Sequence, residues 1–144
     1  MRVDFYHLTE GPAEAAVPAL AAKALEAGER LIIVSADADQ RRRISEALWA
    51  HRPESFLAHG EAGGPHDARQ PILLGAAPDP ANGARFCVLA DGQWREAAGL
   101  ARLFLLFGAD RIDDARGTWR ALGTREGVER HYWKQQGRRW VEGP

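Results

Sequence analysis

The sequence has one cysteine, no long apolar run and almost no net charge. The single Cys87 among 144 residues cannot form an internal disulfide, which favours a reducing, cytoplasmic location. The longest apolar candidate, Leu103 to Phe107, is far shorter than the roughly 18 residues that a membrane span needs. The first residues also lack the basic stretch and apolar run of a secretory signal. We therefore expect a cytoplasmic globular protein with no membrane partner.

The near-zero net charge of −1 argues against a protein that coats nucleic acid, which needs a large excess of basic residues. The charge is nevertheless uneven. Residues 1–110 hold 11 basic and 15 acidic side chains, a net of −4, whereas residues 111–144 hold 8 basic and 5 acidic, a net of +3. This distribution favours an acidic partner at the C-terminal end of the chain.

Motifs for nucleotide chemistry and for nucleophilic catalysis are missing. The sequence contains no G-x-x-x-x-G-K-[ST], no G-x-S-x-G, and no G-x-G-x-x-G after the first predicted strand. Cys87 lies in the apolar run Phe86-Cys87-Val88-Leu89, which is typical of a buried thiol rather than a nucleophile. Asp37 and Asp39 follow a predicted strand, where they are either functional carboxylates or caps of the next helix. Nothing here indicates a cofactor.

Three histidines, His51, His59 and His66, fall in one predicted loop. Their spacings of eight and seven residues match no compact metal motif, and no second cysteine assists them. We therefore predict no metal site, and the sequence leaves the role of these histidines open.

Strand-like and helix-like segments alternate along the chain, which predicts a single α/β domain over residues 1–144 with a mostly parallel central sheet. The predicted strands are residues 3–8, 31–34, 71–74, 86–90 and 103–107, and the predicted helices are residues 13–27, 37–51 and 111–124. Pro18 places the start of the first helix near Val17 or kinks it. Residues 51–70 read as an extended loop. The segment Glu96 to Leu106 could alternatively be a helix, and residues 127–144 form a short strand or wrap across the surface.

The connection between the third and fourth predicted strands is short, and this predicts that the sheet is mixed at that point.

Two surfaces are candidates for docking. Arg116 and Arg120 are four residues apart on the last predicted helix, with Trp119 beside them, so the three form either a receptor for carboxylates with an apolar anchor or a solvated cationic face over a core tryptophan. Trp49 ends the second predicted helix and Phe56 follows it, so these two are either an exposed aromatic contact or closure of the core.

Several segments together resemble the chi subunit family of the bacterial DNA polymerase III holoenzyme. The most specific stretch is Leu48-Trp49 followed by Pro53-Glu54-Ser55-Phe56 and His59. The other matching pieces are Val3-Asp4-Phe5-Tyr6, Ala27-Gly28-Glu29-Arg30-Leu31, Gln70-Pro71-Ile72-Leu73-Leu74, Asn82-Gly83, Ala115-Arg116 with Trp119-Arg120, Tyr132-Trp133-Lys134-Gln135 and Gly137-Arg138-Arg139-Trp140.

The resemblance implies a Rossmann-like α/β fold without a nucleotide site, and a non-catalytic adaptor in the clamp-loader assembly. Such an adaptor grips the acidic C-terminal tail of single-stranded DNA-binding protein, which ends in Pro-Phe, so its link to single-stranded DNA is indirect. By the resemblance, Arg116 and Arg120 with Trp119 match the tail-binding positions. Ile112 stands where the family has a further basic residue, and we count the adjacent Arg111 with the tail-binding residues.

The resemblance also implies a second contact surface, at Trp49 and Phe56, for the psi subunit or an XPD-like helicase. Two alternatives remain from other classes. One is a direct single-stranded DNA-binding module built on Trp133, Lys134, Arg139 and Trp140, whose aromatic and basic residues interleave. The other, less favoured, is a nucleotide-binding enzyme.

Overall fold

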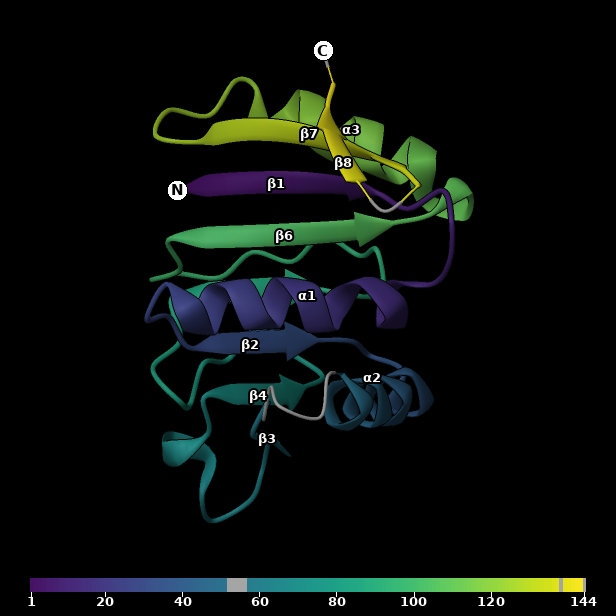
Figure 1. Ribbon diagram of the computed structural model, residues 1–144. Helices are drawn as coiled ribbons and strands as arrows, with labels where there is room; N and C mark the ends of the chain where they lie inside the picture. The colour runs from purple at the N-terminus through teal and green to yellow at the C-terminus, as the bar shows by residue number, and fades with distance from the viewer. Residues whose placement is uncertain (52–56, 138, 144) are drawn as a thin grey trace.

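The computed structural model describes residues 1–51, 57–137 and 139–143, which form one sheet with helices on both faces (Figure 1). The strands are β1 (Arg2–His7), β2 (Leu31–Val34), β3 (His59–Glu61), β4 (Ile72–Gly75), β5 (Phe86–Leu89), β6 (Arg102–Phe107), β7 (Glu129–Gln136) and β8 (Arg139–Glu142). The helices are α1 (Ala13–Glu26), α2 (Ala38–Ala50) and α3 (Ile112–Leu122), with short 3₁₀ turns at Asp67–Arg69 and Ala109–Arg111.

The sheet has the strand order β3-β4-β2-β5-β6-β1-β7-β8. Every neighbouring pair is parallel except β7 with β8. The inner strands β2, β4 and β6 are continuous apolar runs because helices or loops cover both of their faces. The expected mostly parallel α/β sheet is therefore confirmed, and the choice of strand over helix for β6 is correct.

The predicted position of the antiparallel pairing is wrong. The third and fourth predicted strands, β4 and β5, lie on opposite sides of β2 and both run parallel to it. The loop between them passes the start of β2, where the Asn82 side-chain amide donates hydrogen bonds to the carbonyl oxygens of Leu31 (3.2 Å) and Gln70 (2.9 Å). This anchoring holds the connection as a crossover rather than a hairpin. The sheet is mixed instead at its β7–β8 edge.

The helices divide between the two faces of the sheet. Buried side chains of α1 and α2 belong to one core cluster, and those of α3 belong to the cluster on the opposite face (Figure 1). Asp37 caps α2, since its carboxylate accepts a hydrogen bond from the backbone N–H of Asp39 at 2.9 Å. The capping interpretation is thus confirmed for Asp37, whereas Asp39 lies within the first turn of the helix and pairs with Arg42.

Two other boundaries differ from the prediction. α1 begins at Ala13 and runs through Pro18, so the start near Val17 is wrong. Ala13 and Pro18 are both buried, and their packing outweighs the backbone hydrogen bond that proline cannot make. Residues 51–70 are not all loop, since they contribute the edge strand β3.

Cys87 is buried in β5, as expected, and burial raises the pKa of its thiol to about 12, which disfavours the nucleophilic thiolate. Among the described residues, no helix has the length and apolar character to cross a membrane.

Candidate partner-binding site

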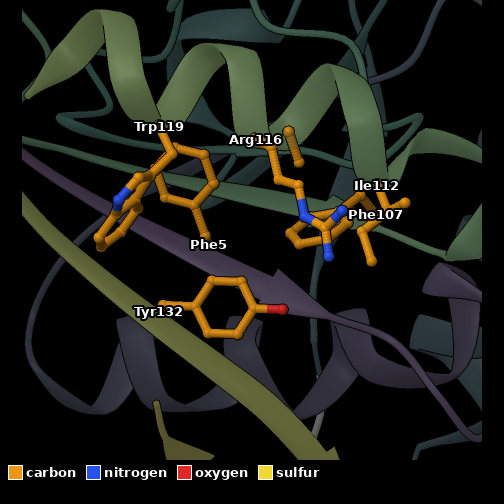
Figure 2. A pocket seen from close by; sticks show the side chains of 7 residues that line it. Phe5, Phe107, Ile112, Arg116, Trp119 and Tyr132 are labelled. Atoms are coloured by element: carbon orange, nitrogen blue, oxygen red, sulfur yellow. The ribbon is translucent and has the colours of Figure 1, made fainter. Parts of the chain in front are cut away.

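A pocket lies between α3 and the strands β1, β6 and β7 (Figure 2). Its volume is about 270 Å³. This is just below the roughly 300–1,000 Å³ of pockets for drug-sized ligands, so it suits one or two side chains. The residues that line it are Phe5, Phe107, Ile112, Ala115, Arg116, Trp119 and Tyr132.

Helix and strand periodicity bring these residues together. Positions 112, 115, 116 and 119 lie on one face of α3, because residues three and four apart are neighbours on a helix. On the sheet, Phe5 of β1 pairs in register with Tyr132 of β7, so both side chains point to the same face. The C-terminal strand β7, which we expected only as a short strand or a surface segment, therefore supplies one wall of the pocket.

Trp119 is partly buried against the core of this face and also lines the pocket. Its ring meets Phe5 edge-on at 5.2 Å between centroids and Tyr132 edge-on at 6.2 Å. Arg130 lies over the same indole at 4.1 Å and donates a hydrogen bond to the Trp119 carbonyl at 2.7 Å. Trp119 therefore packs against the core, as one interpretation expected, while its role as the apolar anchor of a docking site stays a prediction.

Arg116 supplies the cation at the mouth of the pocket. Its side chain is 65% exposed, and its one ion pair within the described chain is to the exposed Asp113, at 3.9 Å. An exposed pair of this length contributes little, because solvent and salt screen it. Figure 2 shows the guanidinium beside Phe107 and Ile112, at the end of the pocket toward which the Tyr132 hydroxyl points.

The other predicted basic residues occupy different places. Arg120 is exposed one turn further along α3 and does not line the pocket. Arg111 points away from the pocket, pairs with Asp114 at 3.3 Å and lies against Gly92. Ile112, and not a basic side chain, lines the pocket at the position where the resemblance implies a cation.

A histidine–tyrosine pair at the polar end was missed by the sequence reasoning. His7 Nδ1 lies 2.8 Å from the Tyr132 hydroxyl oxygen, and the His7 ring stacks on Phe107 at 5.1 Å. Burial lowers the pKa of His7, and the positive charges of Lys134 and Arg116 lower it further. Only the β1–β7 register brings His7 and Tyr132 together, so the linear sequence held no local signal for the pair.

The opposite face of β1 and β7 is occupied by internal contacts. Asp4 is 0% exposed and accepts hydrogen bonds from Arg2 Nη2 (3.0 Å), Arg102 Nε (2.7 Å) and Trp133 Nε1 (3.0 Å). Burial acts to raise the pKa of Asp4, but these hydrogen bonds outweigh it and hold the pKa below its ordinary value. Trp133 and Trp140 both pack against Tyr6.

This packing separates the residues that suggested a DNA-binding surface. Trp133 pairs in register with Tyr6 and Lys134 with His7, so the two side chains point to opposite faces of the sheet. Trp133, Lys134, Arg139 and Trp140 therefore do not form one interleaved aromatic and basic surface.

Trp49, at the end of α2, is 54% exposed. Its ring lies against His59, with 4.4 Å between ring centroids. His59 is held in turn by Ser45 Oγ at 2.8 Å from Nε2 and by the Leu57 carbonyl at 2.8 Å from Nδ1. Phe56, the second aromatic predicted for this surface, lies outside the described residues.

The remaining histidines of the predicted loop are His51 and His66. His51 follows the last residue of α2, and His66 is exposed before a 3₁₀ turn. Across residues 1–51, 57–137 and 139–143, no group of histidine, cysteine, aspartate and glutamate side chains has the geometry for a metal ion.

Fold and site together define a class: an α/β domain with a small aromatic pocket bordered by cations, and with no phosphate-binding loop motif in its sequence. Comparison with protein-family models narrows this class. The model described as DNA polymerase III chi subunit, HolC, matches residues 1–129, and the chain belongs to this family. The chain is therefore a member of a family of DNA polymerase III subunits, which act in DNA replication. No match was found among individually curated proteins.

Proposed function

We propose that the protein is a non-catalytic adaptor of the DNA polymerase III holoenzyme that binds the acidic C-terminal tail of single-stranded DNA-binding protein in the α3 pocket. It thereby links that protein to the clamp-loader assembly. The observation that carries the proposal is the placement of Arg116 at the mouth of an aromatic pocket sized for a side chain. Membership of the chi family supports it.

The chemistry of the pocket matches that of a tail rich in carboxylates and ending in Pro-Phe. A terminal phenylalanine needs an apolar cavity, which Phe5, Trp119 and Tyr132 provide. The carboxylates of the tail need cations. Four basic residues lie on α3 or on the side of β7 that faces α3: Arg116, Arg120, Arg130 and Lys134. No active site is needed for this role. Screening predicts that the binding weakens as salt is added.

Fluorescence anisotropy with a labelled acidic peptide ending in Pro-Phe tests the proposal. We expect Arg116→Ala to weaken binding about tenfold or more, since hydrogen bonds to charged groups are worth about 1.5–3 kcal/mol. Removing the terminal Phe should weaken it by a similar factor, because burying a phenylalanine is worth about 1.5–3 kcal/mol.

The chain offers a closely matched control in Arg42 on α2. Arg42 is 67% exposed and pairs with Asp39 three residues earlier, as Arg116 pairs with Asp113. Arg42→Ala should leave peptide affinity unchanged. If Arg116→Ala and the peptide without Phe both bind as well as the originals, the site assignment is wrong.

The proposal includes a second contact, at Trp49, for the psi subunit or an XPD-like helicase. The exposure of Trp49, and its support by His59, favour a preformed aromatic contact. Co-purification with these candidate partners should be lost in Trp49→Ala and kept in Arg116→Ala, while binding of the acidic tail shows the reverse. Loss of both interactions in either variant would contradict two independent surfaces.

A further inference from the structure

Basic side chains gather at the polar end of the pocket: Arg116 lines it, and His7 and Lys134 lie next to it without lining it. His7 and Lys134 are paired in register on β1 and β7, on the same face of the sheet as Tyr132. The groups that face His7 are Tyr132 and Lys134 from β7, Arg116 from α3 and the uncharged ring of Phe107 from β6. Within the described chain, Lys134 makes no ion pair and Arg116 has only the long contact to Asp113. An anion at this end would therefore meet several cations with little competition.

We propose that Lys134 and the His7–Tyr132 pair form, with Arg116, the binding site for the terminal carboxylate of the bound tail, and that His7 positions the Tyr132 hydroxyl. This inference rests on the proposed function and specifies how the end of the tail is recognised. Residues 130–144 lie beyond the family-model match, so Tyr132 and Lys134 come from a part of the chain that the match does not cover.

The hydrogen bond between His7 and Tyr132 couples recognition to the protonation of His7. When Nδ1 of a neutral His7 accepts from the Tyr132 hydroxyl, the hydroxyl proton points away from the pocket. When His7 is protonated, Nδ1–H donates to the Tyr132 oxygen, which leaves the hydroxyl proton available for a ligand. Since a carboxylate only accepts hydrogen bonds, it binds the second arrangement better. The added positive charge acts in the same direction.

Binding of a carboxylate therefore raises the pKa of His7 from its lowered value in the free protein. By linkage, affinity increases as the pH falls through the histidine range. The carboxylates of the tail, with ordinary pKa values near 4, stay ionised over this range and do not mask the effect.

Two peptides test the role of Lys134: the acidic Pro-Phe peptide with a free carboxylate and its C-terminal amide. We expect the wild type to bind the amide about tenfold more weakly or worse, since the terminal charge is lost. Lys134→Ala should bind the free peptide more weakly and reduce this ratio severalfold, while Lys134→Arg restores it. Lys23→Ala removes the only other lysine of the chain, exposed on α1, and should leave the ratio unchanged.

A pH series tests His7. Between about pH 8 and pH 5.5, on either side of the ordinary histidine value near 6.5, wild-type affinity for the free peptide should rise about threefold to tenfold. His7→Gln should flatten this profile. Tyr132→Phe should flatten it too, and it keeps the aromatic ring in place, so the result does not depend on how His7→Gln packs. His66→Gln, at an exposed histidine, should keep the wild-type profile.

The outcomes separate the inference from the proposed function. If the peptide binds but Lys134→Ala keeps the wild-type ratio, and His7→Gln and Tyr132→Phe keep the wild-type pH profile, the carboxylate site is contradicted and the adaptor proposal stands. If the wild type binds neither peptide, the proposed function itself is contradicted.

Discussion

The two faces of the β1–β7 strand pair are built from alternating residues of the same two strands. They differ in how far their charged side chains find counter-charges within the chain. On the α1 side, Asp4 takes its hydrogen bonds from Arg2, Arg102 and Trp133, and it is fully buried. On the α3 side, the aromatic rings leave a pocket open, and Arg116, the cation that lines it, has only a 3.9 Å contact to the exposed carboxylate of Asp113 in the described chain.

One histidine on each face of the β1–β7 strand pair shows the same difference in counter-charges. His131 on β7 lies between Glu142 (2.6 Å) and Glu129 (2.5 Å), whose carboxylates raise its pKa. The pKa of His7 is lowered by burial and by Lys134 and Arg116. One face supplies the counter-charges for its own ionised groups, whereas the cations of the other face have few counter-charges in the described chain. This difference is the basis for our proposal that partner binding belongs to the face whose charges the fold leaves unneutralised.

The largest expected effect comes from the closed face. Asp4→Ala leaves Arg2, Arg102 and the Trp133 indole N–H without their acceptor; the two arginines are partly exposed, and losing hydrogen bonds to a charged group costs about 1.5–3 kcal/mol. Chemical denaturation should show a loss of this size in the free energy of unfolding at neutral pH. Asp113→Ala, at a carboxylate that is 94% exposed, should change it by less than about 0.5 kcal/mol.

The pH dependence of Asp4 follows from its lowered pKa. The stability that it contributes is present above the ordinary value of 3.8 and is lost as the pH falls through the lowered folded value. The difference between wild type and Asp4→Ala should therefore shrink only in strong acid. An equal loss for Asp113→Ala would show that the two faces do not differ in the way described.

A smaller effect is expected on the outer side of α3. Gly117 lies in the middle of the helix, outside the pocket, and a Cβ built on it meets no atom within 4 Å. Gly117→Ala should raise the free energy of unfolding by about 0.5–1 kcal/mol, because glycine is the poorer helix former. Denaturation and peptide titration on the same sample measure both properties. Loss of peptide affinity in Gly117→Ala would extend the binding surface beyond the pocket.

The smallest effect concerns His131, whose side chain is 25% exposed. Because its folded pKa is raised, its contribution to stability is full below the ordinary value of 6.5 and is lost as the pH rises through the folded value. His131→Gln should remove this part of the pH dependence of unfolding, while His66→Gln retains it. Superimposable pH profiles for wild type and His131→Gln would show that the two glutamates do not bind the protonated histidine.

Much of the fold was predictable because its signals are local. The apolar runs of β2, β4 and β6, the Asp37 cap and the charge of the C-terminal segment all appear within a few residues of one another. On α3, the spacing of Arg116 and Trp119 also placed two pocket residues correctly on one helix face. The antiparallel edge was misplaced because strand order depends on contacts between distant segments, such as the anchoring of Asn82 to Leu31.

The rest of the pocket depends on sheet register, which no short window of sequence contains. Phe5, Phe107 and Tyr132 come from three strands that are distant in the chain and meet only in the folded sheet. Arg111 and Ile112 are adjacent in sequence, but Ile112 lines the pocket whereas Arg111 pairs with Asp114 outside it. Which of the two faces the pocket depends on where α3 begins and how it lies on the sheet, so the sequence could not decide whether Arg111 joins the tail-binding residues. The closed Asp4 network was missed for the same reason.

The most direct test of the central claim uses the five tryptophans as reporters on different surfaces. Trp119 lines the pocket. In a ¹H–¹⁵N spectrum, titration with the acidic Pro-Phe peptide should therefore shift the indole N–H signal of Trp119. The signal of Trp133, whose indole N–H donates to Asp4 on the other face, should stay in place. A shift of Trp133 with no change at Trp119 would contradict the account.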